Sequence, residues 1–428
     1  MFARAVVEGF EGRGGVGWGI RPKVGPTRMR PPARSAPFFG GQGILRRSCL
    51  LCLLATVGLY AILLTSYNLT RYSRSIHLRS AGRDRHNELE QIVTKEIVSR
   101  LLSRVKVLRP EVERCKDTKT LVHLAFIVVG DTYKFLTALK ALLLSRKSTS
   151  CTFFVLHVLA DQPTFLRLRN SSVLKLKTEP YNPEAAAAAV FGDRAESRLV
   201  GYMYKVESYT SLLPATLVRQ NLHYSGVPAM LKLMYDRILP PNVEKAIALD
   251  LDVLVLNDLV ELWQHDAKWE EGSFFAMVEE QSEWYANPLL TKTSWLGGAN
   301  DFHNSYRWPH LGRGFNTGVI LMNLKRMREA KEAWKSLWTR SYQAVLLQHP
   351  RWKLQLGDQD VFNACINDHP AIVTTLPCGW NLQDAGLKTS ALMCTPRSSW
   401  SIVHFNFFAK RRSFWSGLLR SFYNYRAV

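Results

Sequence analysis

Residues 244–258, EKAIALDLDVLVLND, are the stretch that decides the fold. The apolar run predicts a buried strand, yet it contains two aspartates, Asp250 and Asp252, two positions apart. An unpaired carboxylate costs several kcal/mol to bury, a large part of the stability of a domain, so these acids need a partner. Because side chains alternate along a strand, we expect both carboxylates on one face at its carboxyl end, where a divalent cation and its phosphates bind.

Strands and helices alternate on either side of this stretch. Continuous apolar runs at residues 121–130 and 151–160 are each followed by a helical pattern, and residues 225–239 predict a helix that ends before Pro240. Such alternation is typical of a parallel sheet that helices cover on both faces. Residues 177–198 lack a core-facing pattern and are interpreted as a surface insertion. Further predicted elements are strands at residues 273–279, 318–323 and 401–406 and a helix at residues 358–366.

The N-terminal part of the chain predicts a membrane anchor. Residues 48–67, SCLLCLLATVGLYAILLTSY, are 20 uncharged residues, enough to cross ~30 Å of hydrocarbon as a helix. Residues 1–47 carry nine Arg or Lys against two Glu, which favours a cytoplasmic basic tail and a type II orientation. A cleaved signal peptide is the alternative, although it needs a shorter apolar core and a small-residue cleavage site. Residues 68–118 then form a stem, with a helix at residues 87–108 through which two chains could pair as a homodimer, and residues 119–428 form a luminal catalytic domain.

Charge and cysteines restrict the partners and the compartment. The net charge is +21, of which the tail supplies 9 − 2 = +7, and the remaining +14 is spread thinly without an aromatic-interleaved basic stripe. We therefore predict no nucleic-acid partner and expect an acidic substrate or acidic membrane glycans. Cys378 and Cys394, which flank a loop, are the predicted disulfide, and Cys365 is expected to be buried. Asn170-Ser-Ser is a usable glycosylation sequon.

Polar residues near the end of another predicted strand extend the candidate site. His404 lies in the apolar strand SIVHFNF, and Lys410 follows six residues later. A histidine in such a place is more often a core residue with satisfied hydrogen bonds. Beside two aspartates that need a cation, however, its imidazole would complete a mixed oxygen and nitrogen set suited to Mn²⁺, and Lys410 would then reach a diphosphate.

Two further polar motifs stand next to predicted elements. In GRGFNTGVILMN, residues 312–323, a tight turn explains the glycines but leaves the polar pair Asn316 and Thr317 unexplained. In GDQD, residues 357–360, Asp358 could simply cap the helix that follows, but capping does not explain all three polar residues. Trp380 lies on a predicted loop, where it could either stack on a sugar ring or pack in the core.

Five motifs, in order along the chain, resemble glycosyltransferase family 8, whose members are nucleotide-sugar transferases. They are ALDLDVLVLNDLVELW, GRGFNTGVILMNL, LGDQDVFNA, LPCGWN and HFNFFAK, and the likeness spans residues 122–425. HYSGVPAMLKL (223–233), VEEQSEWY (278–285) and WPHLGRGFNTGVI (308–320) are similar to a xylosyltransferase domain of this family that works beside a second, glucuronate-adding domain. The resemblance implies an α/β fold of the GT-A type, with a mixed, mostly parallel sheet covered by helices, behind an N-terminal transmembrane helix and stem.

The resemblance also implies roles for individual residues. Asp250, Asp252 and His404 would bind Mn²⁺, which holds the diphosphate of UDP. The other implied site residues are Val129, Gly130 and Asp131 for uridine and ribose, Lys232 and Lys410 for the phosphates, Gln359 and Asp360 near the anomeric carbon with Asp358 in the same motif, and Asn316 for the donor or acceptor sugar.

The implied activity is a retaining, Mn²⁺-dependent transfer of xylose from UDP-xylose to a glycoprotein glycan that ends in glucuronate, at the Golgi membrane. The alternatives are xylose transfer to glucosides or xylosides, use of another UDP-hexose, and a catalytically silent membrane scaffold or glycan-binding protein. Two features depart from the family. The chain ends after SFYNYRAV without a second transferase domain, so we expect it to add xylose without building an alternating polymer alone. Phe407 stands where the family usually has a glycine, three residues after the metal histidine.

Overall fold

The computed structural model describes the region that carries most of the predicted site. The described residues are 120–130, 132–145, 152–170, 176–178, 180–186, 199–265, 269–282, 284–285, 308, 310–350, 352–383, 394, 396 and 399–406. All of them belong to one compact unit, Arg79–Val428. The predicted tail, anchor and stem therefore lie outside the described residues, as do Asp131 and Lys410. None of the helices in the described ranges is long and apolar enough to cross a membrane.

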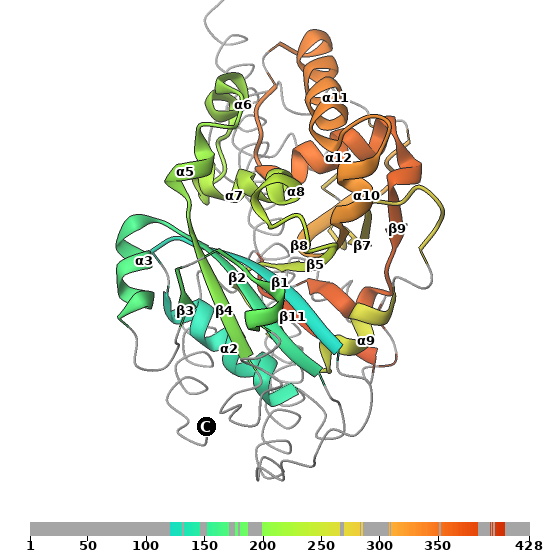
Figure 1. The fold of residues 1–428 in the computed structure, drawn as a ribbon. Helices are drawn as coiled ribbons and strands as arrows, with labels where there is room; N and C mark the ends of the chain where they lie inside the picture. Colours follow the sequence, from blue (N-terminus) through green and yellow to red (C-terminus); the bar gives the residue numbers. More distant parts are fainter. Residues whose placement is uncertain are drawn as a thin grey trace, which may run out of the picture. The chain divides into compact units, whose positions relative to one another are not determined.

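An eight-stranded mixed sheet runs through this unit (Figure 1). The strand order is β3-β4-β2-β1-β5-β8-β7-β9; β8 is antiparallel to both of its neighbours, and the other neighbouring pairs are parallel. The mixed, mostly parallel sheet was predicted and is confirmed. The bounds are β1 Thr120–Val128, β2 Thr152–Ala160, β3 Leu176–Lys177, β4 Leu199–Lys205, β5 Lys245–Leu249, β7 Phe275–Glu279, β8 Phe315–Asn323 and β9 Val373–Thr375.

Helices cover both faces of the sheet. Alternate side chains of its strands point to opposite faces and pack in two different cores. In β1, Leu124 and Phe126 pack in one core and Ala125 in the other. The first core takes in α2 (Thr132–Ser145), α3 (Gln162–Arg169) and α9 (Leu259–Trp263). The second takes in α6 (Ala215–Gln220), α8 (Tyr235–Ile238), α10 (Leu324–Glu329), α11 (Trp334–Gln348) and α12 (Asp358–Asp368), which Figure 1 shows above the sheet.

The aspartate stretch is not one strand, so this prediction was wrong. β5 ends at Leu249, Asp250 to Asp252 form a turn, and β6 (Val253–Val255) pairs antiparallel with β11 (Ile402–His404) in a second sheet. That sheet has the order β10-β11-β6, with β10 at Leu382–Gln383. The turn lets the charged carboxylates leave both ladders while the apolar residues before and after them stay buried.

Two other predicted elements need correction. The predicted helix at residues 225–239 is helical from Gly226 to Ile238, but as three consecutive pieces: α7 (Gly226–Ala229), the 3₁₀ helix η1 (Met230–Met234) and α8. Gly226 has a left-handed φ of 68° and Pro228 lacks an N–H, which disfavours one regular α-helix. The surface insertion at residues 177–198 does have a core face, because Tyr181 and Ala186 are buried; its residues 187–198 lie outside the described ranges.

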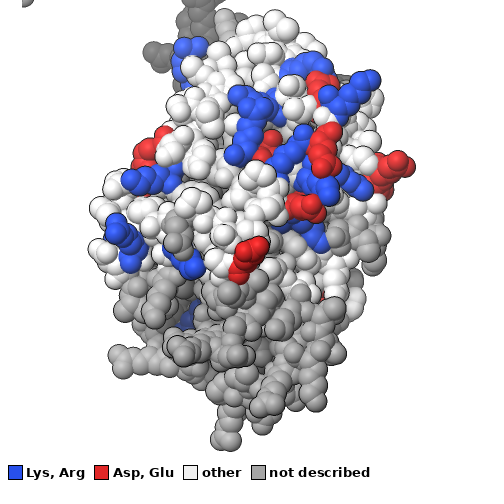
Figure 2. Space-filling model, viewed as in Figure 1, with Lys and Arg blue, Asp and Glu red and all other residues white. Residues whose placement is uncertain are grey.

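The cysteine predictions are confirmed. Cys378 and Cys394 form a disulfide with a Cα–Cα distance of 5.7 Å, and Cys365 is a buried free thiol. On the face shown in Figure 2, Lys and Arg side chains lie among Asp and Glu side chains. Two exposed ion pairs illustrate the mixture: Lys325 with Glu244 at 3.0 Å and Arg340 with Glu332 at 2.6 Å.

Candidate active site

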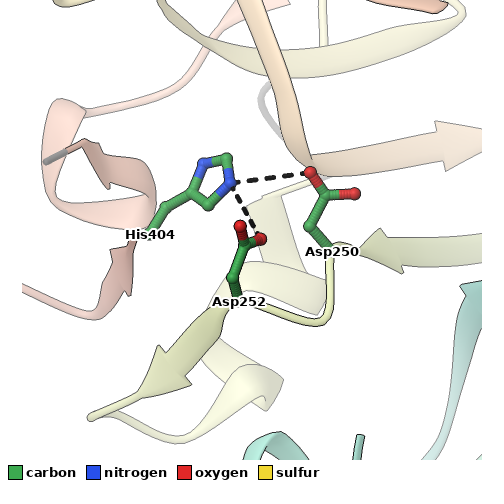
Figure 3. Close-up of side chains that lie close together, drawn as sticks. All are labelled: Asp250, Asp252 and His404. Carbon is green, nitrogen blue, oxygen red and sulfur yellow. Dashed lines mark ion pairs between the residues drawn. The ribbon is translucent and has the colours of Figure 1, made fainter. Parts of the chain in front are cut away.

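The turn after β5 and the end of β11 bring Asp250, Asp252 and His404 together (Figure 3). His404 Nε2 lies 3.5 Å from Asp250 Oδ2 and 3.3 Å from Asp252 Oδ1. One potential ligand atom from each residue lies within 4.8 Å of the others. Two carboxylate oxygens and one imidazole nitrogen form a donor set that fits Mn²⁺ or a related divalent cation.

Backbone contacts with neighbouring segments hold these three residues in place. The N–H of Asp250 donates to the carbonyl of Gly318 at 2.9 Å, and the N–H of Phe405 donates to the carbonyl of Asp252 at 2.8 Å. A β carbon on Gly318 would lie 2.1 Å from Cε1 of His404, so the imidazole occupies the space that any other side chain would need. The glycine of β8 and the histidine of β11 therefore belong to one arrangement.

Lys232 places a buried positive charge beside the three residues. It lies in η1, is 5% exposed, and places Nζ 2.6 Å from Asp250 Oδ1, 3.3 Å from Asp358 Oδ2 and 3.1 Å from the carbonyl oxygen of Thr317. Burial alone would lower the pKa of Lys232, but Asp250 and Asp358 raise it above its ordinary value. The ammonium group therefore stays charged beside the carboxylates.

Burial and contacts among the charged groups also set the pKa values of the acids and of His404. Burial would raise the pKa of Asp250, but Lys232 and His404 outweigh it and hold this pKa well below its ordinary range. Burial would lower the pKa of His404, whereas Asp252 and then Asp250 raise it to about 9. Burial raises the pKa of Asp358, against the opposing effect of Lys232. Asp358 is the first residue of α12 and Gly357 is its N-cap, so Asp358 pairs with Lys232 instead of capping the helix.

Glu280 accepts hydrogen bonds from two of the predicted site residues, although the sequence did not predict it as part of the site. Its Oε2 accepts hydrogen bonds from Asn316 Nδ2 at 3.0 Å and from Gln359 Nε2 at 3.1 Å. Glu280 follows β7 and is 3% exposed, whereas the preceding Glu279 is exposed. Two acids in succession at the end of a predicted strand do not show whether either carboxylate is buried, so the sequence carries no signal for Glu280.

Asn316, Asp360 and Trp380 are held by protein groups. Oδ1 of Asn316 accepts from Gly318 N and Asn381 Nδ2, each at 2.9 Å, while its Nδ2 donates to Glu280. Asp360 accepts from Tyr285 Oη at 2.8 Å and from Leu356 N at 2.9 Å, and burial raises its pKa to about 6. Trp380, one of whose two predicted roles was sugar stacking, packs in the core at 6% exposed.

The predicted nucleoside-contacting segment lies at the carboxyl end of β1. Val129 is 38% exposed, and Gly130 has a φ of 72°, a conformation that favours glycine. Gly130 N donates to Thr164 Oγ1 at 2.9 Å, and its carbonyl accepts from Arg167 Nη2 at 3.3 Å. The segment is therefore anchored to α3 and leaves Val129 open to solvent.

The fold and site define a class of protein. Residues 200–411 match the family model of glycosyl transferase family 8, so this stretch of the chain is a domain of that family. The mixed, mostly parallel sheet with helices on both faces agrees with the GT-A type of fold that the motifs predicted.

The relatives of the chain are named as two-activity enzymes. It is 31% identical over 288 residues to the xylosyl- and glucuronyltransferase LARGE2s of Gallus gallus, covering 67% of this chain and 33% of the relative. It is 28% identical over 300 residues to the xylosyl- and glucuronyltransferase LARGE1 of Homo sapiens, covering 70% and 34%. The chain thus spans about a third of the length of these curated relatives.

Solved structures of transferases are also similar to the chain. Mouse xyloside xylosyltransferase 1 in its apo form is 20% identical, with a TM-score of 0.47, and the match covers 67% of this chain and 98% of that one. The galactosyltransferase LgtC in complex with donor and acceptor sugar analogues is 17% identical, with a TM-score of 0.42, covering 70% and 94%.

Proposed function

We propose that this chain is a retaining, Mn²⁺-dependent transferase that moves xylose from UDP-xylose to a glycan ending in glucuronate. The observation that carries the proposal is the convergence of Asp250, Asp252 and His404, with the buried, charged Lys232 beside them. The choice of xylose is supported by the names of the relatives and by the blocks at residues 223–233, 278–285 and 308–320. The positive charge beyond the tail, +14, favours an acidic acceptor.

In this proposal the site binds the diphosphate end of the donor. Asp250, Asp252 and His404 would hold the cation, which when bound supplies Lewis acidity for the departing UDP. Lys232 and Lys410 add positive charge near the phosphates, and Val129, Gly130 and Asp131 contact uridine and ribose. Lys232 is suited to this role because its neighbours keep it protonated.

Gln359, with Asp358 and Asp360 of the same motif, would lie near the anomeric carbon of the donor. The acceptor hydroxyl attacks that carbon from the face that UDP leaves: the new C–O bond forms as the bond to the β-phosphate oxygen breaks. The proton of the hydroxyl passes to the departing phosphate. This route retains the anomeric configuration without asking the amide of Gln359, a poor nucleophile, to form a covalent bond.

We further propose that the enzyme is a type II protein of the Golgi membrane, paired through a stem helix at residues 87–108. The basic tail and the apolar residues 48–67 support this orientation. The disulfide between Cys378 and Cys394 also supports an oxidising lumen.

A donor panel tests the proposal. The purified full chain is incubated with Mn²⁺ and UDP-xylose, UDP-glucose or UDP-galactose, with and without a glucuronide acceptor, and products are weighed by mass spectrometry. We expect an acceptor heavier by one pentose with UDP-xylose only. A hexose product would instead identify another UDP-hexose transferase, and no turnover with any donor would favour the scaffold.

Asp252→Asn tests the metal assignment within the same assay. The amide keeps the size of the side chain but removes an anionic ligand, so transfer should fall at least ~100-fold while the melting temperature changes little. Asp258→Asn is the matched control: this buried acid, six residues away, caps α9 by accepting from Val260 N, a bond that an amide oxygen can keep. Near-normal transfer by Asp252→Asn would show that the metal assignment is wrong.

A further inference from the structure

A chain of buried side chains connects His404 with Glu280. His404 Nδ1 lies 3.1 Å from Oδ1 of Asn381. Asn381 Nδ2 donates to Oδ1 of Asn316 at 2.9 Å, and Asn316 Nδ2 donates to Oε2 of Glu280 at 3.0 Å. All four side chains belong to residues that are at most 3% exposed. We call the three residues that lead away from His404, which are Asn381, Asn316 and Glu280, the relay.

The orientation of each amide in the relay follows from groups that can only accept or only donate. The backbone N–H of Gly318 only donates, so the oxygen of Asn316 faces it, at 2.9 Å. The nitrogen of Asn316 is thereby left to face Oε2 of Glu280, at 3.0 Å. Asn381 then has to offer a donor to that same oxygen, which leaves its own carbonyl oxygen facing His404.

This orientation selects one form of the His404 ring. An amide oxygen opposite Nδ1 requires a hydrogen on Nδ1. Nε2, on the other side of the ring, faces Asp250 and Asp252 at 3.5 and 3.3 Å. Nδ1 keeps its hydrogen whether or not Nε2 carries one, so Nε2 is the nitrogen that can offer its lone pair to a cation.

Glu280 has a second branch, which leads to Gln359. Gln359 Nε2 donates to the same carboxylate oxygen at 3.1 Å, and Gln359 Oε1 accepts from Thr317 N at 3.3 Å. Because the carboxylate only accepts and the N–H only donates, the amide of Gln359 is oriented as strictly as that of Asn316. One carboxylate thus stands behind both the histidine ligand and the glutamine.

We propose that Glu280, Asn316 and Asn381 are positioning residues that set the orientation and ring form of His404, and that Glu280 also orients Gln359. The inference rests on the proposed function for the identity of the cation. A relay that served packing alone would affect stability without affecting the metal affinity of the molecules that remain folded.

Replacement of Asn381 tests the first branch. Asn381→Leu removes the amide at similar volume, and we expect the Kd of the purified full chain for Mn²⁺, measured without donor by electron paramagnetic resonance of the free ion, to rise about 10- to 100-fold. The kcat at saturating Mn²⁺ should stay close to the wild-type value. Asn381→Asp keeps an acceptor for Nδ1, so its Kd should stay within a few-fold of wild type even if the protein melts earlier.

Asn367→Leu is the matched control for this branch. Asn367 is a buried amide in the last turn of α12, outside the relay, and its Oδ1 accepts from His310 N at 3.1 Å. Loss of this buried amide should lower the melting temperature and leave the Kd for Mn²⁺ unchanged.

Glu280→Leu tests the root of both branches. Leucine has a similar volume and no acceptor, so Asn316 and Gln359 lose the oxygen to which both donate, and Ser282 N loses Oε1 at 3.0 Å. We expect a higher Kd for Mn²⁺ and, unlike Asn381→Leu, also a kcat lowered about 10-fold at saturating Mn²⁺, because Gln359 loses its orientation. Glu279→Leu, on the exposed neighbour, should change neither value.

The outcomes separate the inference from the proposed function. If folded Asn381→Leu and Glu280→Leu bind Mn²⁺ as tightly as wild type, the inference is overturned and the proposed function stands. If the wild-type chain binds no Mn²⁺, or Asp252→Asn binds it equally well, the proposed function fails and the inference fails with it.

Discussion

Gly318 shows how closely single residues are fitted around the candidate metal site. Its backbone links Asp250 and Asn316, and its missing side chain leaves room for His404. The residue lies in β8 without a left-handed φ, so the requirement for glycine is steric and does not come from the backbone conformation.

Gly318→Ala should therefore displace the ligand histidine. The new β carbon would lie 2.1 Å from Cε1 and 2.3 Å from Nδ1 of His404, and such overpacking costs about 1–3 kcal/mol of unfolding free energy. We expect a loss of Mn²⁺ affinity of at least ~10-fold, measured by titration, together with a lower melting temperature. In the His404→Ala background the same methyl group has room, so it should cost little stability. Equal costs in the two backgrounds would contradict this account.

At the scale of elements, one arginine of α10 holds the segment that leads into β5. The five N–H groups of Arg328 donate to five backbone carbonyls, one in α8 and four between α8 and β5, at 2.7 to 3.2 Å. The acceptors are Asp236, Leu239, Pro240, Pro241 and Val243. Two prolines in succession prevent helix there, so a side chain supplies the hydrogen bonds that the backbone cannot.

Arg328→Lys should lower the stability of the fold. A lysine keeps the charge but cannot present a planar fork, so several half-buried carbonyls lose their donor, and we expect a loss of about 3 kcal/mol in urea unfolding. Arg326→Lys is the control in the same helix, because Arg326 reaches only Glu270 and Ser273 carbonyls among the bonds described, at 3.2 and 3.3 Å. Similar losses of unfolding free energy in both variants would contradict this role of Arg328.

At the scale of the whole molecule, a histidine pair inside the sheet links stability to pH. His123 Nδ1 on β1 lies 3.0 Å from His157 Nε2 on β2, and His157 Nδ1 lies 2.9 Å from Tyr204 Oη. Burial lowers the pKa of His123 to about 4; burial, and then His123, lower that of His157 well below its ordinary value. The rings packed around the pair are Tyr181, Tyr202, Tyr204 and Trp263, with Lys177 Nζ 5.9 Å from the Tyr202 ring centroid.

The sign of the effect follows from proton uptake. Below pH 6.5 the unfolded chain protonates these histidines and the folded chain does not, so the wild type loses stability as the pH falls. For one histidine this amounts to about 2 kcal/mol between pH 6.5 and pH 5, at ~1.4 kcal/mol per pH unit. Asp236 and Asp360, whose pKa values burial raises to about 6, act in the opposite direction and are unchanged by a histidine substitution.

His157→Gln should reduce the acid sensitivity of the fold. The difference in unfolding free energy between pH 7 and pH 5, measured in urea, should be about 2 kcal/mol smaller than in wild type. His310→Gln, at an exposed histidine, is the control and should follow the wild type. An identical pH dependence for His157→Gln and wild type would contradict the prediction.

Local patterns in the sequence were sufficient for the class of fold and for the chemical types in the site. Apolar runs and helical periods predicted β1, β2, β7, most of β8 and α12, because burial on one or both faces leaves its mark within a few residues; β3, β4 and β9 were not predicted. The residue types Asp, Asp and His predicted a hard or borderline cation, because ligand chemistry belongs to the side chain and not to the fold.

Only the tertiary structure decided how these residues meet. The division of residues 244–258 between two sheets, the burial of Glu280 in place of Glu279, and the fit of Gly318 to His404 all depend on contacts between segments far apart in the chain. Amide orientation in the relay depends on them as well, since it follows from donors and acceptors on four segments of the chain that are far apart in sequence. A linear pattern records whether a position is apolar or polar, but the partner of a buried polar group is chosen by the packing of the whole unit.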